Sequence, residues 1–300
     1  MNKFNRISVV DVVNFIFWCI ILIFYIITFQ QSEYKSQAII LLSGLAIFSG
    51  SIIYFRGINR KNLLLKLVIL LYPVVFLVVI FDSLHMVLPY INSNVFDKYL
   101  ADIDYRLLGI NPTVWIESII NPPLTEFMYY LYLFYFPMPL IILGYLYKNK
   151  MYYELDKSMV FYFLTYYGSY LMYFIVPALG PRFYQPLVEL QQVQLTGLWY
   201  TDLIRDTISS LEHNKFDAFP SLHAAITLTT ILIIGKYKKR WLYFFIPILI
   251  GIFISLIYCR YHYFIDIVGG VIWTIISYWI VEKWYNKISS TRFVPFYSDN

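Results

Sequence analysis

The stretch from residue 241 to residue 266, WLYFFIPILIGIFISLIYCRYHYFID, joins a long apolar run to a short polar turn. The apolar part, at about residues 241–258, approaches the roughly 20 residues that an α-helix needs to cross about 30 Å of hydrocarbon. The turn leads to His262 and Asp266, which are four residues apart and share one face of a helix. The stretch therefore predicts a membrane-crossing helix followed by titratable side chains at the start of the next helix.

Similar apolar runs recur along the whole chain. Of its 300 residues, 60% are hydrophobic and only 14% are charged, which excludes an ordinary soluble domain. The predicted spans lie at about residues 9–29, 38–55, 63–81, 127–147, 159–176, 219–235, 241–258 and 264–283. The first run is longer than a signal-peptide core and lacks a small-residue cleavage pattern, so we interpret it as a retained helix. We expect an all-α, polytopic integral membrane protein with about eight transmembrane helices.

Basic residues are distributed unevenly over the loops between these runs. One alternating set of loops and termini carries fifteen Lys and Arg, whereas the other set of loops carries seven. Because Lys and Arg concentrate in short cytoplasmic loops, both termini are expected in the cytoplasm. All four histidines then fall on or near the extracytoplasmic or lumenal face. The formal net charge of +5 follows from the cytoplasmic loops and gives no indication of nucleic-acid binding.

Three short segments at the outer ends of predicted helices carry the chemistry. They are Gly180-Pro181-Arg182-Phe183, Phe219-Pro220-Ser221-Leu222-His223 and Arg260-Tyr261-His262-Tyr263-Phe264-Ile265-Asp266. The helices that carry His223 and Asp266 both begin outside, so their N-terminal backbone N–H groups are expected to favour an anion. Arg182 and Arg260 add guanidinium groups that match phosphate oxygens. Together the segments indicate a phosphate-binding site.

These three segments resemble the signature motifs of the type-two phosphatidic acid phosphatase and haloperoxidase superfamily. Within it, the chain is most similar to the branch of the inositol phosphorylceramide synthases and their bacterial relatives. The segment from Asp104 to Pro112 also resembles this branch. The resemblance covers residues 63–284 and implies a six-helix catalytic core with outer loops 82–126 and 177–218. Residues 1–62 are then a two-helix membrane extension, and residues 285–300 are a cytoplasmic tail.

The resemblance also implies catalytic roles. His262 corresponds to the nucleophile, Asp266 to the carboxylate that orients it, His223 to the acid for the leaving group and Arg182 to a phosphate ligand. Within the same segments, Arg260 and Ser221 are further phosphate-binding candidates. The chain departs from the widespread motifs at four positions, which predicts a phosphate pocket built differently from that of the common lipid phosphatases. These positions are Ile175, Phe183, Leu222 and Leu256.

These roles predict a lipid-phosphate phosphatase that works through a phosphohistidine without a metal or another cofactor. Transfer of a phosphorylated headgroup to an alcohol or lipid acceptor shares the first step and stays an alternative. A non-enzymatic lipid transporter is a more remote one, because the ionisable residues gather at one face and not at the membrane midplane. His85 and His213 are interpreted as interfacial residues, and Asp102 and Asp104 as solvated loop acids.

The charge asymmetry predicts which loops are accessible from outside. In a variant without Cys19 and Cys259, single cysteines near residues 95, 205 and 262 should react with a membrane-impermeant thiol reagent on intact cells. Cysteines near residues 58, 149 and 238 should react only after the cells are permeabilised, because their basic loops stay in the cytoplasm. Labelling of position 238 on intact cells would contradict the topology and the compartment of the site.

Overall fold

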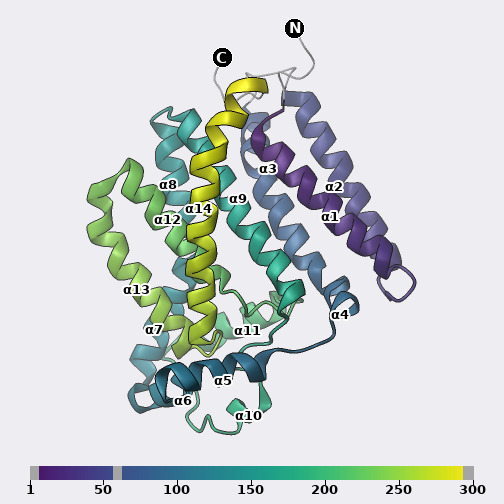
Figure 1. Cartoon of the computed structure of the whole chain (residues 1–300). Helices are drawn as coiled ribbons and strands as arrows, with labels where there is room; N and C mark the ends of the chain where they lie inside the picture. Colours follow the sequence, from purple (N-terminus) through teal and green to yellow (C-terminus); the bar gives the residue numbers. More distant parts are fainter. Residues whose placement is uncertain (1–6, 57–62, 293–300) are drawn as a thin grey trace. The chain divides into compact units, whose positions relative to one another are not determined.

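The computed structural model describes residues 7–56 and 63–292. Within these ranges the regular structure is helical, and no residue lies in a strand (Figure 1). The expected all-α fold is confirmed. The helices are α1 (Val9–Thr28), α2 (Lys35–Arg56), α3 (Leu63–Ser83), α4 (Leu88–Ile91), α5 (Asp97–Leu108), α6 (Pro112–Trp115), α7 (Pro122–Phe134), α8 (Pro137–Lys148), α9 (Tyr152–Ile175), α10 (Gln185–Val188), α11 (Thr201–Leu211), α12 (Leu222–Tyr237), α13 (Leu242–Tyr258) and α14 (Phe264–Arg292), with the short 3-10 helices η1 (Leu84–Met86), η2 (Ile116–Ile119) and η3 (Lys239–Trp241).

Several of these helices are suited to cross a membrane. Among the described residues, four are long and apolar enough, at Val9–Thr28, Lys35–Phe55, Lys239–Tyr258 and Phe264–Ile288. The pair α7 and α8 passes the same test as one span bent by 41°. The bend falls directly before Pro137, whose ring cannot continue a helix without a clash. The chain is therefore a polytopic membrane protein, whereas the count of eight spans stays a prediction.

The chain forms two compact units, which are described separately. Unit 1 comprises Met1–Ile91, Leu143–Tyr167 and Ser277–Asn300. In it, α1 packs against α2 and α3. Ser8 caps α1 by accepting a hydrogen bond from the N–H of Asp11 at 3.2 Å, and the Asp11 carboxylate accepts another from the Tyr72 hydroxyl. Because hydrocarbon offers no partner to polar groups, the Asp11–Tyr72 pair satisfies both groups internally and ties α1 to α3.

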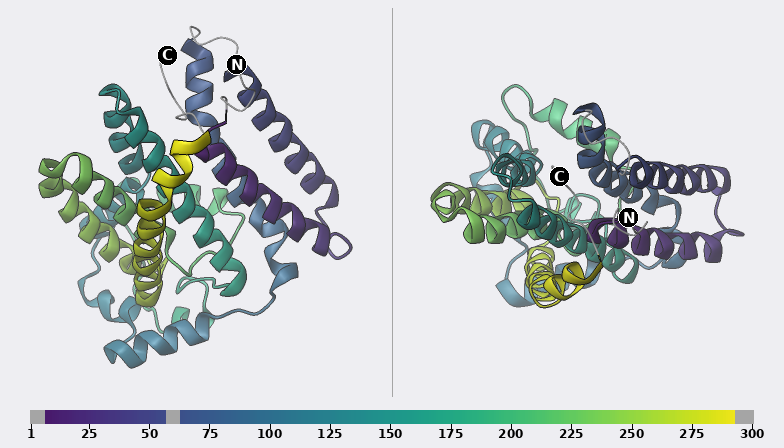
Figure 2. Two further views of the ribbon diagram at one scale, coloured as in Figure 1. Left: turned by 45° about the horizontal axis from the view of Figure 1, so that its top comes forward. Right: turned by 90° about the horizontal axis from the view of Figure 1, so that it is seen from above.

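Unit 2 contains all the residues of the candidate site. It comprises Asn92–Ile142 and Gly168–Ile276. Helices α12 and α13 lie side by side as an antiparallel pair joined through η3, and α13 also packs along α7 (Figures 1 and 2). The Thr125 and Tyr258 hydroxyl oxygens, 2.8 Å apart, join the start of α7 to the end of α13. Helices α7 and α12 therefore both pack against α13, with His223 on α12 and His262 in the turn that follows α13.

Two glycines let α14 approach the start of α12. A Cβ atom on Gly270 would lie 2.5 Å from the backbone oxygen of Ser221, and one on Gly269 would lie 2.8 Å from the Phe219 ring. At this contact the Ser221 N–H donates to the backbone oxygen of Asp266 at 2.9 Å. The absence of side chains at 269 and 270 thus brings the second and third signature segments together.

This close approach predicts a selective effect of a single methyl group. Gly270→Ala should destabilise the protein in detergent by about 1–3 kcal/mol, because the added Cβ meets a backbone atom that cannot move aside cheaply. The matched control is Gly144→Ala in α8, where a Cβ meets nothing within 4 Å and Ala has the higher helix propensity. Thermal unfolding of both variants measures the difference. Equal stability of the two variants would contradict the packing described.

Candidate active site

His262 lies in the turn between α13 and α14, and its ring is fixed through Nδ1. This nitrogen is 2.9 Å from the backbone oxygen of Ala218 and 3.4 Å from Oδ2 of Asp266. A carbonyl oxygen can only accept, so the contact assigns the proton to Nδ1 and leaves the lone pair on Nε2. Burial lowers the pKa of His262 to about 3, although the hydrogen bond to Ala218 opposes the shift. The imidazole is therefore neutral near pH 7.

Asp266 lies in the first turn of α14, whereas His262 precedes this helix by two residues, so the two do not share a helix face as expected. The Asp266 side chain is fully buried. Oδ2 accepts a hydrogen bond from the Tyr263 N–H at 2.7 Å, whereas Oδ1 is buried and has no hydrogen-bond partner among the described residues. The expected pairing of His262 with Asp266 is present, but Ala218 makes the shorter contact with the ring.

His223 enters the site from α12. Ser221 caps this helix through its hydroxyl, which accepts from the Ala224 N–H at 3.3 Å, and this places His223 in the first turn. The His223 ring stacks on Tyr132 and packs against Tyr135, with centroids 4.4 and 4.3 Å apart. Its centroid lies 5.8 Å from that of His262, and its enclosed Nε2 has no hydrogen-bond partner among the described residues. The structure thus brings the two histidines and Asp266 together.

Two buried carboxylates of α5 hold the surrounding segments. Asp97 accepts hydrogen bonds from the N–H groups of Leu179 and Gly180 at 2.8 and 2.7 Å, and from the Tyr263 hydroxyl at 2.9 Å. Asp104 accepts from the N–H groups of Phe264 and Ile265 at 2.7 and 2.8 Å. Burial raises the pKa of both carboxyl groups above the ordinary range, although the backbone donors oppose the shift.

These contacts correct two expectations. Asp104 is 1% exposed, so the interpretation as a solvated loop acid is wrong for this residue, although Asp102 is exposed. The first N–H groups of α14 bind Asp104, so these groups do not face an anion as expected. Sequence reasoning also missed Asp97. Its signal is the seven-residue spacing to Asp104, which places both carboxylates on one face of α5 two turns apart.

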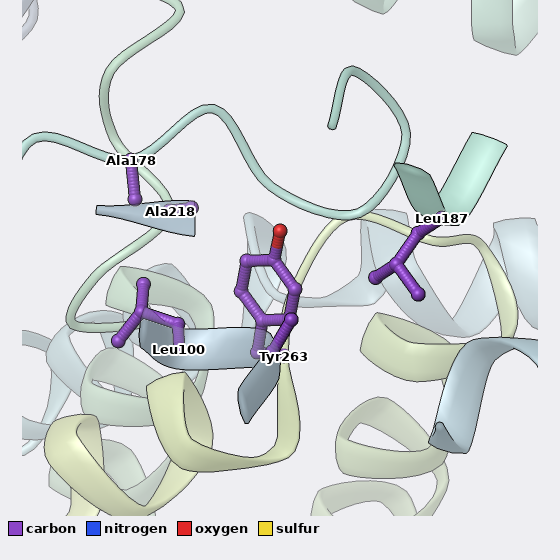
Figure 3. Close-up of a cluster of buried hydrophobic side chains, with 6 residues drawn as sticks. Leu100, Ala178, Leu187, Ala218 and Tyr263 are labelled. Atoms are coloured by element: carbon purple, nitrogen blue, oxygen red, sulfur yellow. The ribbon is translucent and has the colours of Figure 1, made fainter. Parts of the chain in front are cut away.

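The same face of α5 supports an apolar cluster beneath the site. Leu100 and Ala101 lie between the two carboxylates along the helix and pack with Tyr263. Figure 3 shows the Tyr263 ring among side chains from α5, from the segments before Arg182 and before α12, and from α10. The buried members are Leu100, Ala101, Ala178, Leu187, Ala218 and Tyr263. Because Tyr263 is part of this cluster, the cluster fixes the turn that carries His262.

The two candidate phosphate-binding arginines are paired with carboxylates. Arg182 binds Glu212 and lies over the Tyr261 ring, with 4.2 Å between the guanidinium carbon and the ring centroid. Arg260 donates to Glu117 Oε1 and to the Val193 backbone oxygen, both at 2.6 Å. Each arginine keeps a buried Nε without a hydrogen-bond partner among the described residues. Both guanidinium groups thus retain a donor for a further acceptor.

A cavity of about 620 Å³ adjoins these arginines. Arg182 and Arg260 line it together with Arg205 of α11, whereas His223 and His262 are not among its lining residues. Its remaining walls combine hydrogen-bonding and apolar side chains, namely Tyr129, Phe183, Val188, Gln191, Gln194, Leu195, Thr196, Asp202, Ser209, Cys259 and Tyr261. The cavity is larger than a phosphate ion needs and falls within the usual range of small-molecule sites, about 300–1,000 Å³.

Comparison with known proteins places this site in a family. A 174-residue stretch is 29% identical to a phosphoinositol dihydroceramide synthase from Bacteroides thetaiotaomicron, covering 54% of this chain and 56% of that protein. A 110-residue stretch is 30% identical to a PA-phosphatase related-family protein from Dictyostelium discoideum, covering 36% of this chain and 20% of that protein. The chain thus spans about half the length of the first relative and a fifth of the second. No solved structure matches the chain significantly.

The family assignment rests on a longer match. The sequence model of the PAP2 superfamily, which comprises the type-two phosphatidic acid phosphatases, matches residues 98–280. The match runs from α5 into α14 and includes all three signature segments and Asp104. Because it covers more than half of the chain, the resemblance expected from these segments is confirmed, and the chain belongs to the PAP2 superfamily.

Proposed function

We propose that this membrane protein cleaves a phosphoester bond of a lipid through a phosphohistidine on His262. The observation that carries the proposal is the orientation of the His262 ring, whose Nδ1 contacts Ala218 and Asp266 and whose Nε2 keeps the lone pair. A neutral, oriented imidazole is the form of histidine that attacks phosphorus. Membership in the PAP2 superfamily supports the lipid phosphoester as the substrate.

The proposed first step forms one bond and breaks one. Nε2 of His262 attacks phosphorus, and the bond between phosphorus and the leaving oxygen breaks. His223 donates a proton to this oxygen, which leaves as an alcohol. Arg182 and Arg260 offset the charge on the phosphoryl oxygens, and Asp266 stabilises the positive charge that His262 acquires. Ser221 contributes indirectly, because its hydroxyl caps α12 and fixes the turn that holds His223.

In the second step, His223 takes the proton of a water or alcohol molecule, whose oxygen attacks phosphorus; the bond between phosphorus and Nε2 breaks and releases His262. With water as the nucleophile the protein is a lipid phosphatase, which needs no second substrate. We further infer that the reaction takes place on the extracytoplasmic or lumenal face. It needs no divalent metal or cofactor, since both histidines are assigned to attack and proton transfer.

Transfer to an alcohol is the second candidate function, and a specific observation favours it. His262 is only 5% exposed, and a cavity of about 620 Å³ adjoins the phosphate-binding arginines. A site closed to bulk water favours a bound alcohol over water as the nucleophile. The names of the two relatives, a synthase and a phosphatase-related protein, correspond to these two outcomes.

The proposal predicts the effect of removing each catalytic side chain. His262→Ala, His223→Ala and Asp266→Ala should each lower the turnover of a lipid phosphoester by about a thousandfold, as for the loss of one member of a cooperating set. The control is His213→Ala, because His213 is exposed and has no assigned role. Each assay contains a metal chelator. Near-normal turnover by His262→Ala would rule out His262 as the nucleophile. Loss of wild-type activity in the chelator, restored by one metal, would contradict metal independence.

The second step predicts where solvent oxygen appears. With a lipid phosphomonoester in ¹⁸O-labelled water, the phosphatase function should yield free phosphate that carries one solvent oxygen from breakdown of the phosphohistidine. A parallel reaction supplies a phosphodiester donor with and without a lipid alcohol. Mass spectrometry of the products distinguishes the two functions. Product that forms only when the alcohol is present would contradict hydrolysis and identify the protein as a transferase.

A further inference from the structure

Helix α11 is amphipathic, and its polar face borders the cavity. Asp202, Arg205 and Ser209 line the cavity and recur at intervals of three and four residues, which places them on one face of the helix. Directly after α11, Glu212 binds Arg182. One side of this short helix therefore lines the cavity beside Arg182.

The other side of α11 carries large apolar side chains that no part of the described structure covers. Leu203 and Leu211 are 63% and 72% exposed, and Trp199, just before the helix, is 80% exposed. Leu198 and Tyr200 extend the same exposed segment. Apolar side chains gathered in this way mark an interaction surface. Tryptophan and tyrosine beside leucine are typical of the boundary between lipid headgroups and acyl chains.

Glu126 fixes the position of this segment along a membrane helix. Its carboxylate accepts hydrogen bonds from the N–H groups of the four residues from Leu198 to Thr201, at 2.9–3.3 Å, and from the Thr201 hydroxyl at 2.7 Å. Glu126 is the fifth residue of α7, and α7 with α8 forms the bent pair that is long and apolar enough to span. The start of α11 is thereby held at the end of a span, where the boundary of a bilayer lies.

We propose that the exposed side of α11, together with Leu198–Tyr200, docks onto the interfacial region of the lipid bilayer. The partner is a zwitterionic lipid surface, because the charged side chains of the helix, Asp202, Arg205 and Asp206, supply no excess of positive charge for anionic lipids. The docked helix holds its polar face over the cavity at the depth of the lipid headgroups. A lipid phosphoester then passes from the bilayer to Arg182 without leaving the interface. This last consequence rests on the proposed function, whereas the docking does not.

Fluorescence quenching tests the docking without any assay of activity. The purified protein is placed in phosphatidylcholine nanodiscs whose acyl chains carry bromine near the headgroup. The difference between wild type and Trp199→Phe isolates the emission of Trp199, which should be strongly quenched by shallow bromines and less by bromines at the chain ends. An unquenched Trp199 would overturn the proposal. Crosslinking between copies that carry Leu203→Cys, without quenching, would assign the surface to a second copy instead.

A pair of matched variants tests the consequence for substrate access. Leu203→Glu combined with Leu211→Glu should lower kcat/KM by about tenfold for a long-chain lipid phosphoester in vesicles, because charge opposes docking. For a short-chain, water-soluble phosphoester the change should stay below about twofold. The matched control, Leu203→Met combined with Leu211→Met, keeps this surface apolar and should leave both substrates unaffected. Equal losses for both substrates would overturn the access role. A wild-type protein inactive on either substrate would refute the proposed function and leave the quenching result to decide the docking.

Discussion

The hydrogen bonds from two segments of backbone to the carboxylates of Asp97 and Asp104 are the interaction on which the site depends. Neither segment has regular structure to satisfy its N–H groups at these positions, because one is a loop and the other is the first turn of a helix. Leaving one such buried N–H unpaired costs about 1–3 kcal/mol. A single helix face therefore sets the positions of Gly180, which precedes Arg182, and of Tyr263, which follows His262.

The burial of these acids explains the charge arrangement around them. Helix N-termini favour negative charge, and in α14 this preference is met by Asp104. The N-terminus of α14 thus stabilises the Asp104 carboxylate. In the proposed reaction, the guanidinium groups would therefore offset the charge of the phosphate. Arg182 and Arg260 are kept in place by Glu212 and Glu117, each of which offers the paired oxygens that a phosphoryl group also presents.

The sequence was sufficient to predict the features that depend on local pattern. Each predicted apolar run coincides with helix over most of its length, and the four-residue spacing of His262 and Asp266 brings the two side chains together. The features it missed depend on contacts between distant residues. Asp97 binds a segment more than 80 residues away and Asp104 one about 160 away, so no local spacing indicates their partners. The break between α7 and α8 was also missed, although Pro137 marks it.

The contact between the His262 ring and the Ala218 carbonyl limits what mutagenesis can show about this site. The acceptor belongs to the main chain, so no codon change at position 218 removes it, and a replacement there alters only the methyl group that packs in the buried cluster. A mutational scan at position 218 would therefore detect only the effect of side-chain size on packing in this cluster. Side-chain substitutions would therefore not reveal the carbonyl that selects the tautomer of His262, and only a change of the backbone itself, such as an ester in place of the amide, would weaken this contact.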